Sequence, residues 1–304
     1  MVDMKMIVER FDEVVFKGDG GEYHIWSNST TPLLSAGKIH MRPHAFAPPH
    51  YGDSSKICCV LEGTITVGLM ARHSTEEKIV QMKKGDAMPV LAGDVSWWFN
   101  SGDTNGVVVF FGETSKALVP RKFTHFLMAG VLGAQARSQP DFINKTFGLD
   151  QNESNNIVNS GQDEVLMKLD QEMKFPKASD DMKDKLYASI NDPYGEVSVK
   201  GGGVVSSLSE KNLPLLGEIG LSARFVKLEG NAMLAPSYVA DGSVQICYVA
   251  TGSGRIMVIS NEEKPALDSK VGEGDLVVVP QFFVTTLIAD ACGMEVYSVI
   301  NSSK

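Results

Sequence analysis

The sequence predicts an all-β protein with a minor α-helical part, in which two similar β domains follow one another along the chain. Three observations lead to this prediction: a repeat at one fixed offset, short strand-like runs in both halves, and helix-like spacing confined to the segment between the halves. Self-similarity at a fixed offset indicates a duplicated structural unit, so it sets the domain organisation before any single element is considered.

The repeat relates residues that lie 189 positions apart, as Gly63 and Gly252 do. The matched positions are Gly63 with Gly252, Gly85-Asp86 with Gly274-Asp275, Leu91 with Pro280, and Val107–Phe111 with Val296–Ile300. One shared Gly-Asp would carry little weight, but four features at a single offset predict a duplicated domain.

Both halves contain short apolar or alternating runs that are rich in Val, Ile and aromatic residues. Gly, Asp, Asn and Ser punctuate these runs, as expected of strands joined by turns. Examples are "SKICCVLEG", "TITVGLM" and "VVVFFG" in the first half, and "VQICYVA", "GRIMVIS" and "DLVVVP" in the second. Evenly spaced short strands are typical of a sandwich or a barrel, and the absence of alternating long helices disfavours a parallel doubly wound sheet.

The segment between the halves has a different pattern. The runs "SQPDFINKTFGL" and "DQNESNNIVNSG" place apolar residues at helical spacing, and Asp150 or Asn152 is a candidate cap for the second run. The polar run "KFPKASDDMKDK" predicts a loop, and "KGGGVVSSLS" predicts a second flexible joint. The predicted organisation is an N-terminal domain with a helical appendage over 1–180, a linker over 175–195, and a C-terminal domain over 195–304.

Charge and hydropathy exclude two classes of partner. The 304 residues carry a net charge of −9, and no run of Lys or Arg exceeds two residues. Nucleic-acid binding needs clustered cations, so no nucleic acid is expected. A membrane-spanning helix needs roughly 18 uninterrupted apolar residues, and the sequence contains no such run.

The N-terminus and the cysteines predict a cytoplasmic location. Charged residues interrupt "MVDMKMIVERFDEVV", so it has no apolar core of a secretory signal. Cys58 and Cys59 are adjacent and would point to opposite faces of a strand, which prevents them from sharing one partner. We expect the four cysteines to be free thiols, as in a reducing compartment.

The motifs resemble those of plant bicupins, specifically the legumin-type (11S) seed globulin and glutelin-like branch. The segments that carry the resemblance are "GDGGEYHIW", "APPHYGDSSK", "GDAMPVLAG" and "WWFNSGD" in the first half, and "LSARFVKLEGNAMLAPSY", "CYVATGSGRIMVI" and "GEGDLVVVPQFFV" in the second. The resemblance implies two cupin (jelly-roll β-barrel) domains in tandem, with short helical segments between them, and a homo-oligomer.

Three departures from that branch predict a cytosolic relative outside the storage proteins. Storage legumins have a signal peptide, an Asn-Gly cleavage point before the second half, and a C-terminal helical arm. Here no signal is expected, and the Asn-Gly at Asn105 lies inside the first barrel. The chain ends at "YSVINSSK", so the helical arm is expected to be absent, which weakens the inference of the family's trimer.

The resemblance also locates the positions where enzymatic cupins hold a metal with three His and one Glu. In the first half these positions carry His50, Gly52, Lys56 and Ser96. In the second half they carry Ser237, Val239, Gln245 and Thr285. An ammonium repels a cation at close range, so no metal is expected in either barrel, and no other cofactor is predicted.

A barrel without a metal can still hold a ligand. The predicted pocket of the first barrel is lined by His50, Lys56, Ser96, Trp98 and Asn100. An inward, desolvated Lys56 could serve as a base, a carboxylate anchor or a Schiff-base amine, and His50 could exchange protons. The structural alternative is that Lys56 reaches the rim, His50 caps a loop and Trp98 fills the core.

Two hypotheses about function follow. The first is a metal-free, globulin-like bicupin that binds a small apolar molecule in its first barrel or serves as a reserve or scaffold protein. The second is a metal-independent enzyme (an isomerase, cyclase or lyase) in which His50 and Lys56 perform acid–base catalysis. Because function resides in the site, the fold alone does not choose between them.

Overall fold

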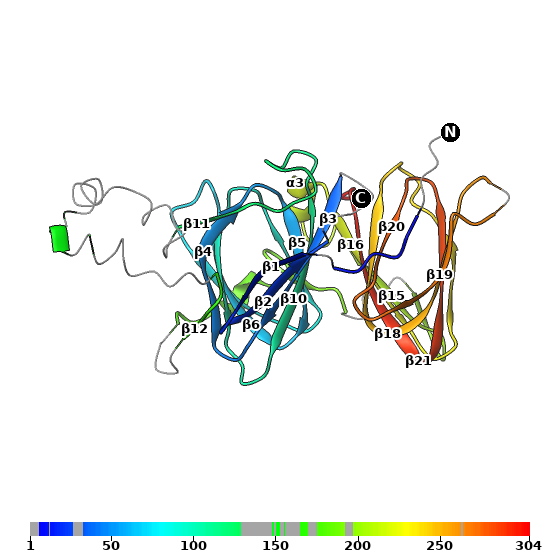
Figure 1. The fold of residues 1–304 in the computed structure, drawn as a ribbon, viewed down its shortest axis with the longest axis horizontal. Helices are drawn as coiled ribbons and strands as arrows, with labels where there is room; N and C mark the ends of the chain where they lie inside the picture. The colour runs from blue at the N-terminus through cyan, green and yellow to red at the C-terminus, as the bar shows by residue number, and fades with distance from the viewer. Residues whose placement is uncertain are drawn as a thin grey trace.

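The structure is a computed structural model of the 304-residue chain. It describes residues 6–11, 13–26, 33–128, 148, 150–152, 155, 165–169, 175–191, 197–262 and 264–304. Two β-barrels lie side by side, the first running from blue to green and the second from yellow to red (Figure 1). The prediction of an all-β protein with two tandem barrels is confirmed.

The first barrel consists of two antiparallel sheets that pack face to face. One sheet has seven strands in the order β1-β2-β3-β10-β5-β8-β13, and the other has six in the order β11-β4-β9-β6-β7, with β12 paired to β4. The strands are β1 (Glu13–Gly18), β2 (Gly21–Ile25), β3 (Leu34–Met41), β4 (Ala45–Gly52), β5 (Lys56–Glu62), β6 (Thr64–Met70), β7 (Lys78–Lys83), β8 (Asp86–Val90), β9 (Val95–Asn100), β10 (Gly106–Glu113), β11 (His125–Leu127), β12 (Met167–Lys168) and β13 (Ala188–Ser189).

The second barrel is organised around two long strands that bend through both of its faces. These are β18 (Gln245–Ile259) and β21 (Val284–Ile300), which pair with each other along most of their length. The other elements are β14 (Val197–Val199), β15 (Gly203–Leu208), α3 (Leu215–Ile219), β16 (Ser222–Leu228), β17 (Met233–Ser237), β19 (Leu267–Gly272) and β20 (Leu276–Val279). Helices in the described part of the chain are short, and none could cross a bilayer as an apolar span.

Two equivalent turns show the duplication in the backbone. Gly85 and Gly274 have φ angles of 90° and 89°, a region that favours glycine because it has no Cβ. Gly85 donates its N–H to Val60 O and Gly274 donates to Val249 O, both over 2.9 Å. The aspartate after each glycine accepts a 2.9 Å bond from the backbone N–H three residues before it. The repeated Gly-Asp is therefore the same hydrogen-bonded turn in each barrel.

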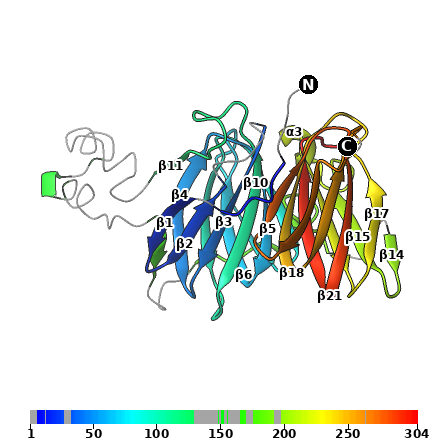
Figure 2. The same ribbon diagram turned by 45° about the vertical axis from the view of Figure 1, so that its right-hand side comes forward.

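Each barrel has its own core, and a third core lies between the barrels. Inward residues such as Cys58 and Val67 fill the first barrel, and Val226 and Val258 fill the second. Residues of both halves meet at the seam, where Trp26 stacks edge-on against Tyr248 with ring centroids 5.7 Å apart. The helix α3 contacts β8 of the first barrel across this seam, which is seen from another side in Figure 2.

The structure differs from the sequence-based expectations around the boundary. Residues 203–208, which we expected in a flexible joint, form β15, because that run pairs along its full length with β16. Within the predicted linker, β13 pairs with β8, and a 3-10 helix covers Asp180–Met182. The linker limits of 175–195 stay a prediction. The two expected helical runs over 138–161 lie mostly outside the described residues.

Candidate functional site

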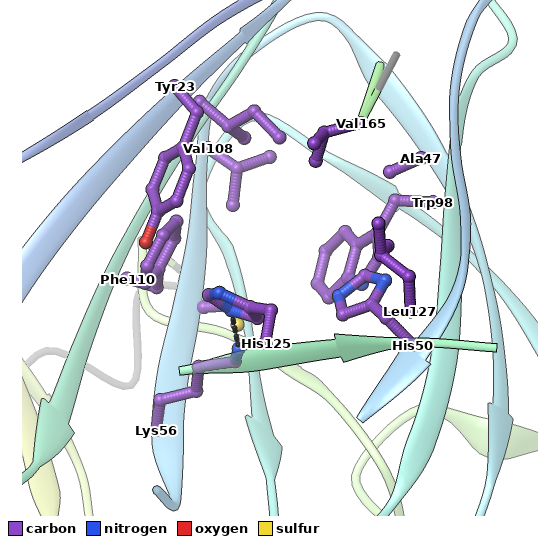
Figure 3. A pocket seen from close by; sticks show the side chains of 12 residues that line it. Tyr23, Ala47, His50, Lys56, Trp98, Val108, Phe110, His125, Leu127 and Val165 are labelled. Atoms are coloured by element: carbon purple, nitrogen blue, oxygen red, sulfur yellow. Dashed lines mark hydrogen bonds between the residues drawn. The ribbon is translucent and has the colours of Figure 1, made fainter. Parts of the chain in front are cut away.

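The first barrel encloses a cavity between its two sheets, and nitrogen atoms gather at one end of it (Figure 3). Its volume is about 70 Å³, counted over positions open to the centre of a water-sized sphere. One water needs roughly 10–15 Å³ by this measure, so a molecule of several heavy atoms fits. The apolar part of the wall consists of Ile39, Ala47, Val108, Phe110, Leu127 and Val165.

Lys56 begins β5 and points into the cavity. Side chains alternate along a strand, so Lys56 and Cys58 face the barrel interior while Ile57 and Cys59 face the seam between the barrels. The Lys56 residue is 6% exposed, and burial lowers the pKa of its amine from the usual 10.5. The alternative in which Lys56 reaches the rim is therefore wrong.

His125 lies against the Lys56 amine, although 69 positions separate the two residues. Lys56 Nζ and His125 Nε2 are hydrogen-bonded at 3.0 Å (Figure 3). The histidine begins β11, which pairs with the end of β4 so that His125 is opposite Gly52. Burial, followed by the nearby Lys56 and His50, holds the pKa of His125 well below 6.5, so its imidazole is neutral at pH 7.

His50 supplies a second neutral imidazole. Its Nδ1 lies 2.8 Å from Pro48 O, and a carbonyl only accepts, so Nδ1 carries the proton. Burial, followed by the charge of Lys56, lowers the pKa of His50 to about 4. Nε2 of the neutral ring is therefore an unprotonated acceptor. The His50 and His125 ring centroids are 5.4 Å apart.

Asp53 fixes the segment that carries His125. Its carboxylate accepts backbone N–H bonds from Leu118 at 2.9 Å and from Thr124 at 3.1 Å, and a hydroxyl bond from Ser54 at 2.9 Å. Burial alone would raise the pKa of Asp53, but these donors outweigh it and lower the pKa. The carboxylate is thus satisfied by Ser54 of its own loop and by the segment before β11, and it holds β11 against β4.

Aromatic side chains complete the polar end of the cavity. The amine of Lys56 lies 5.3 Å from the ring centroid of Phe110 and 6.0 Å from that of Phe123. Tyr23 lines the same cavity, and its buried hydroxyl has no hydrogen-bond partner within the described residues. An unpaired buried hydroxyl is costly, so it marks a position where a polar ligand atom would be stabilised.

The remaining predicted pocket residues lie in different places. Trp98 lines the cavity, whereas Trp97 points outward and donates to Glu77 Oε1 at 2.5 Å. Ser96 lies on β9 opposite His50 and accepts a bond of 3.1 Å from Trp98 Nε1. Asn100 is fully buried outside the cavity lining, where its amide donates to the carbonyls of Met41, Arg42 and Thr104. Ser96 therefore orients Trp98, and Asn100 ties loops together.

The cavity residues do not fit the metal site that the family resemblance implies. That site needs three imidazoles and a carboxylate, but here His50 and His125 are accompanied by an amine and by no lining carboxylate. His125 Nε2 is already bonded to Lys56. Across the described ranges, no cluster of three or more His, Cys, Asp or Glu is arranged to hold an ion.

The second barrel carries uncharged groups at the equivalent places. Gln245 pairs with Val279 as Lys56 pairs with Val90, which confirms the offset at this position. Ser237 lies opposite Thr285 as His50 lies opposite Ser96. The offset of 189 alone would make Val239 the counterpart of His50. Strand pairing shows that the counterpart is Ser237. The Thr285 hydroxyl is buried without a partner among the described residues.

Sequence reasoning missed His125 and Tyr23. His125 stands alone in the sequence, with no ligand-like spacing to His50 or Lys56. Its proximity to Lys56 depends on a three-residue strand that folds back onto β4. Tyr23 follows the "GDGG" turn and carries no local signal either. Only the tertiary pairing brings these side chains to the amine.

Comparisons with known proteins place this architecture. The profile of the family described as "Cupin" matches residues 11–155 and 188–304. The chain is 23% identical to the 12S seed storage protein CRD of Arabidopsis thaliana, over 92% of this chain and 75% of that protein. It is 22% identical to the 13S globulin seed storage protein of Fagopyrum tataricum, over 92% of this chain and 74% of that one.

Solved structures share the fold. The crystal structure of pumpkin seed globulin superposes with a TM-score of 0.90 at 20% identity, covering 100% of this chain and 87% of that one. An 11S globulin from Wrightia tinctoria, whose structure reveals an auxin binding site, has a TM-score of 0.88 at 20% identity and covers 99% and 84%. The match of the family profile to both barrels, together with the paired turns, shows that this chain belongs to the Cupin family.

Proposed function

We propose that this chain is a globulin-like reserve or scaffold protein whose first barrel binds a small, mostly apolar molecule with one polar group. The observation that carries the binding proposal is the cavity between the two sheets, with apolar walls and Lys56, His50 and His125 at one end. The names of the curated relatives support the reserve role, and the auxin site of the Wrightia tinctoria globulin supports small-molecule binding by this fold.

The size of the cavity limits the ligand and its affinity. Micromolar binding needs about 8 kcal/mol. A ligand of about eight heavy atoms would reach this at about 1 kcal/mol per atom, below the ceiling of about 1.5 for very small ligands. The expected occupant is therefore a compact molecule, such as a substituted benzene, whose polar group faces the nitrogens.

Location and assembly complete the proposal. The free thiols of Cys58, Cys59, Cys247 and Cys292 support a cytoplasmic location, because cysteines stay reduced in that compartment. Exposed apolar side chains on the first barrel and its loops support a homo-oligomer, because such side chains are more stable when a partner covers them. The most exposed are Phe11, Val14, Val15, Leu118 and Val119. Sedimentation velocity of the purified chain would measure the assembly.

Two neighbouring residues of β11 test the binding proposal. Leu127 lines the cavity, whereas Phe126 stacks on Tyr51 at the outer surface. Leu127→Trp should fill the cavity and weaken the binding of benzyl alcohol at least tenfold. Phe126→Trp places the same side chain outside and should leave the affinity unchanged. Isothermal titration calorimetry measures both, and equal affinities in the two variants would exclude the cavity as the binding site.

A second candidate function is metal-independent acid–base catalysis, and the Lys56–His125 hydrogen bond favours it. A neutral imidazole beside an amine of lowered pKa is a suitable pair for moving a proton at neutral pH. An enzyme of this kind would exchange the hydrogen next to a carbonyl for deuterium in heavy water. Proton NMR of small ketones incubated with wild type and His125→Gln tests this, and equal exchange rates would rule it out.

A further inference from the structure

We propose that the first-barrel cavity captures small aldehydes covalently, through a reversible imine between the carbonyl carbon and Lys56 Nζ. This inference rests on the proposed binding function, because the carbonyl compound must first enter the same cavity. It deepens that function by naming the chemical class of the ligand and the atom that holds it.

The first argument is the environment of the amine. Lys56 is buried, and no carboxylate forms an ion pair with it within the part of the chain that the structure describes. The carboxylate whose charge acts on it, Asp53, directs its oxygens to Leu118, Thr124 and Ser54. An amine without a counter-ion in an apolar wall loses its proton readily, and the free amine is the nucleophile for a carbonyl.

The second argument is selectivity among lysines. Among the described residues, Lys56 is the one buried lysine, whereas others such as Lys17 and Lys122 are ion-paired at the surface, with Glu22 and Glu13. Exposed or paired amines stay protonated and react slowly at neutral pH. Burial also lowers the pKa of the half-buried Lys38, but Lys38 does not line the cavity. A carbonyl compound that enters the cavity therefore meets Lys56, held at one end of a mostly apolar space.

The third argument is that the neighbouring groups can carry the protons. The amine lone pair attacks the carbonyl carbon, the C=O π electrons move to oxygen, and one proton passes from the nitrogen to that oxygen to give a neutral carbinolamine. A second proton taken up by the same oxygen lets it leave as water while the nitrogen lone pair forms the C=N bond, and the nitrogen then gives up its remaining proton. The net change is R–CHO plus Lys56–NH₂ giving R–CH=N–Lys56 plus H₂O.

Three side chains are placed for these transfers. His125 Nε2 lies 3.0 Å from Nζ and can receive the proton that the nitrogen loses. His50, on β4, offers an unprotonated Nε2 acceptor, because the proton of its ring lies on Nδ1, which donates to Pro48 O. The Tyr23 hydroxyl lines the same cavity, has no hydrogen-bond partner in the part of the chain that the structure describes, and can donate to the carbonyl oxygen. No oxidant, reductant or metal is needed for this chemistry.

The wall opposite the amine selects the rest of the ligand. Val108, Ala47 and Val165 lie at the far end of the cavity from Lys56 (Figure 3). They offer no charged partner, so a charged substituent would be desolvated without compensation. The expected ligands are therefore small apolar aldehydes, with benzaldehyde as a convenient probe.

Reductive trapping tests the inference. The full-length protein is incubated at pH 7.5 with benzaldehyde and sodium cyanoborohydride, which converts an imine into a stable benzyl amine. We expect one benzyl group per chain, mapped by peptide mass spectrometry to Lys56 and formed at least tenfold faster than at any exposed lysine. Lys56→Met should remove this adduct, whereas Lys78→Met, at an exposed lysine of the same barrel, should not.

Further variants separate the imine from simple binding. Leu127→Trp should abolish the Lys56 adduct and Phe126→Trp should retain it; an adduct unaffected by Leu127→Trp would overturn the inference. His125→Gln should slow trapping and shift its pH profile, while circular dichroism confirms folding. If benzyl alcohol binds but benzaldehyde labels exposed lysines evenly, the imine is refuted and the proposed function stands. If neither compound enters the cavity, both fail.

Discussion

The two barrels share one backbone plan and differ at a few inward positions. The turns at Gly85 and Gly274 have the same φ angles and hydrogen bonds, and β5 and the first part of β18 pair in the same register with their neighbours. Yet Lys56 in the first barrel corresponds to Gln245 in the second. The same position therefore carries a titratable group in one barrel and a neutral group in the other. The comparison shows that the scaffold tolerates the exchange, and that a site is defined by side chains on it.

The largest expected difference between the barrels is their response to acid. The pKa of His50 is about 4 in the folded chain and 6.5 when unfolded. Between these values the unfolded chain binds a proton that the folded chain does not, so stability falls as the pH drops from 6.5 towards 4. At about 1.4 kcal/mol per unit, the loss reaches about 3 kcal/mol. Lys56 and His125 are the titratable groups that lie near His50, and burial lowers the pKa of each of them as well.

Urea unfolding of wild type and His50→Gln at pH 7 and pH 4 measures this effect. The variant should lose about 3 kcal/mol less than wild type over this interval, because glutamine does not titrate. Ser237→Gln, at the equivalent position of the second barrel, should keep the wild-type pH dependence. A His50→Gln curve parallel to that of wild type would contradict the burial of a neutral imidazole.

A smaller difference is expected from removing the two equivalent side chains that begin β5 and β18. Lys56→Met replaces a buried amine, which has no counter-ion among the described residues, with an apolar group of similar length. Even with the hydrogen bond to His125 lost, it should stabilise the chain by about 1–3 kcal/mol at pH 7. The gain should shrink as the pH rises towards 10, because the unfolded lysine then also loses its proton.

Gln245→Met is the matched control, since it removes a neutral group and should show no such pH dependence between 7 and 10. Thermal unfolding monitored by circular dichroism at both pH values compares the pair. Equal and pH-independent changes in the two variants would indicate that the Lys56 amine stays charged in the fold.

The smallest difference concerns the equivalent glycines. A Cβ at Gly274 would meet no atom within 4 Å, so Gly274→Ala should cost only the strain of a positive φ, about 1–2 kcal/mol. A Cβ at Gly85 would lie 2.5 Å from Asn191 Nδ2, so Gly85→Ala should cost more unless that side chain moves. Urea denaturation ranks the two, and a larger cost for Gly274→Ala would show that the turns are not equivalent.

The architecture could be predicted from the sequence because the same short motifs occur in both halves of the chain. Gly-Asp turns and apolar runs at one offset predicted a duplicated β domain, and the resemblance to bicupins then placed Lys56, His50 and Trp98 on inward strand positions. The sequence was insufficient for the completed site. His125 reaches Lys56 only through the return of β11 onto β4 and the Asp53 anchor, which have no periodic signal.

Other misplacements have similar physical causes. Asn100 was assigned to the pocket because it follows an inward position of β9, but three carbonyls take up its amide. The glycines before β15 suggested flexibility, yet its partner β16 supplies a full ladder of hydrogen bonds. The Met41 and Arg42 carbonyls are remote from Asn100 in the sequence, and the ladder of β15 forms only once β16 folds back beside it.

The core at the seam has a consequence for the independence of the halves. Trp26 and Phe111 from one half and Tyr248 and Tyr297 from the other are buried together. Either half alone would present this apolar face to water, an arrangement that favours association. Because one polypeptide joins them, each barrel always meets its complement at a high effective concentration. Covalent linkage thus replaces a dilution-sensitive contact with one that does not depend on the protein concentration.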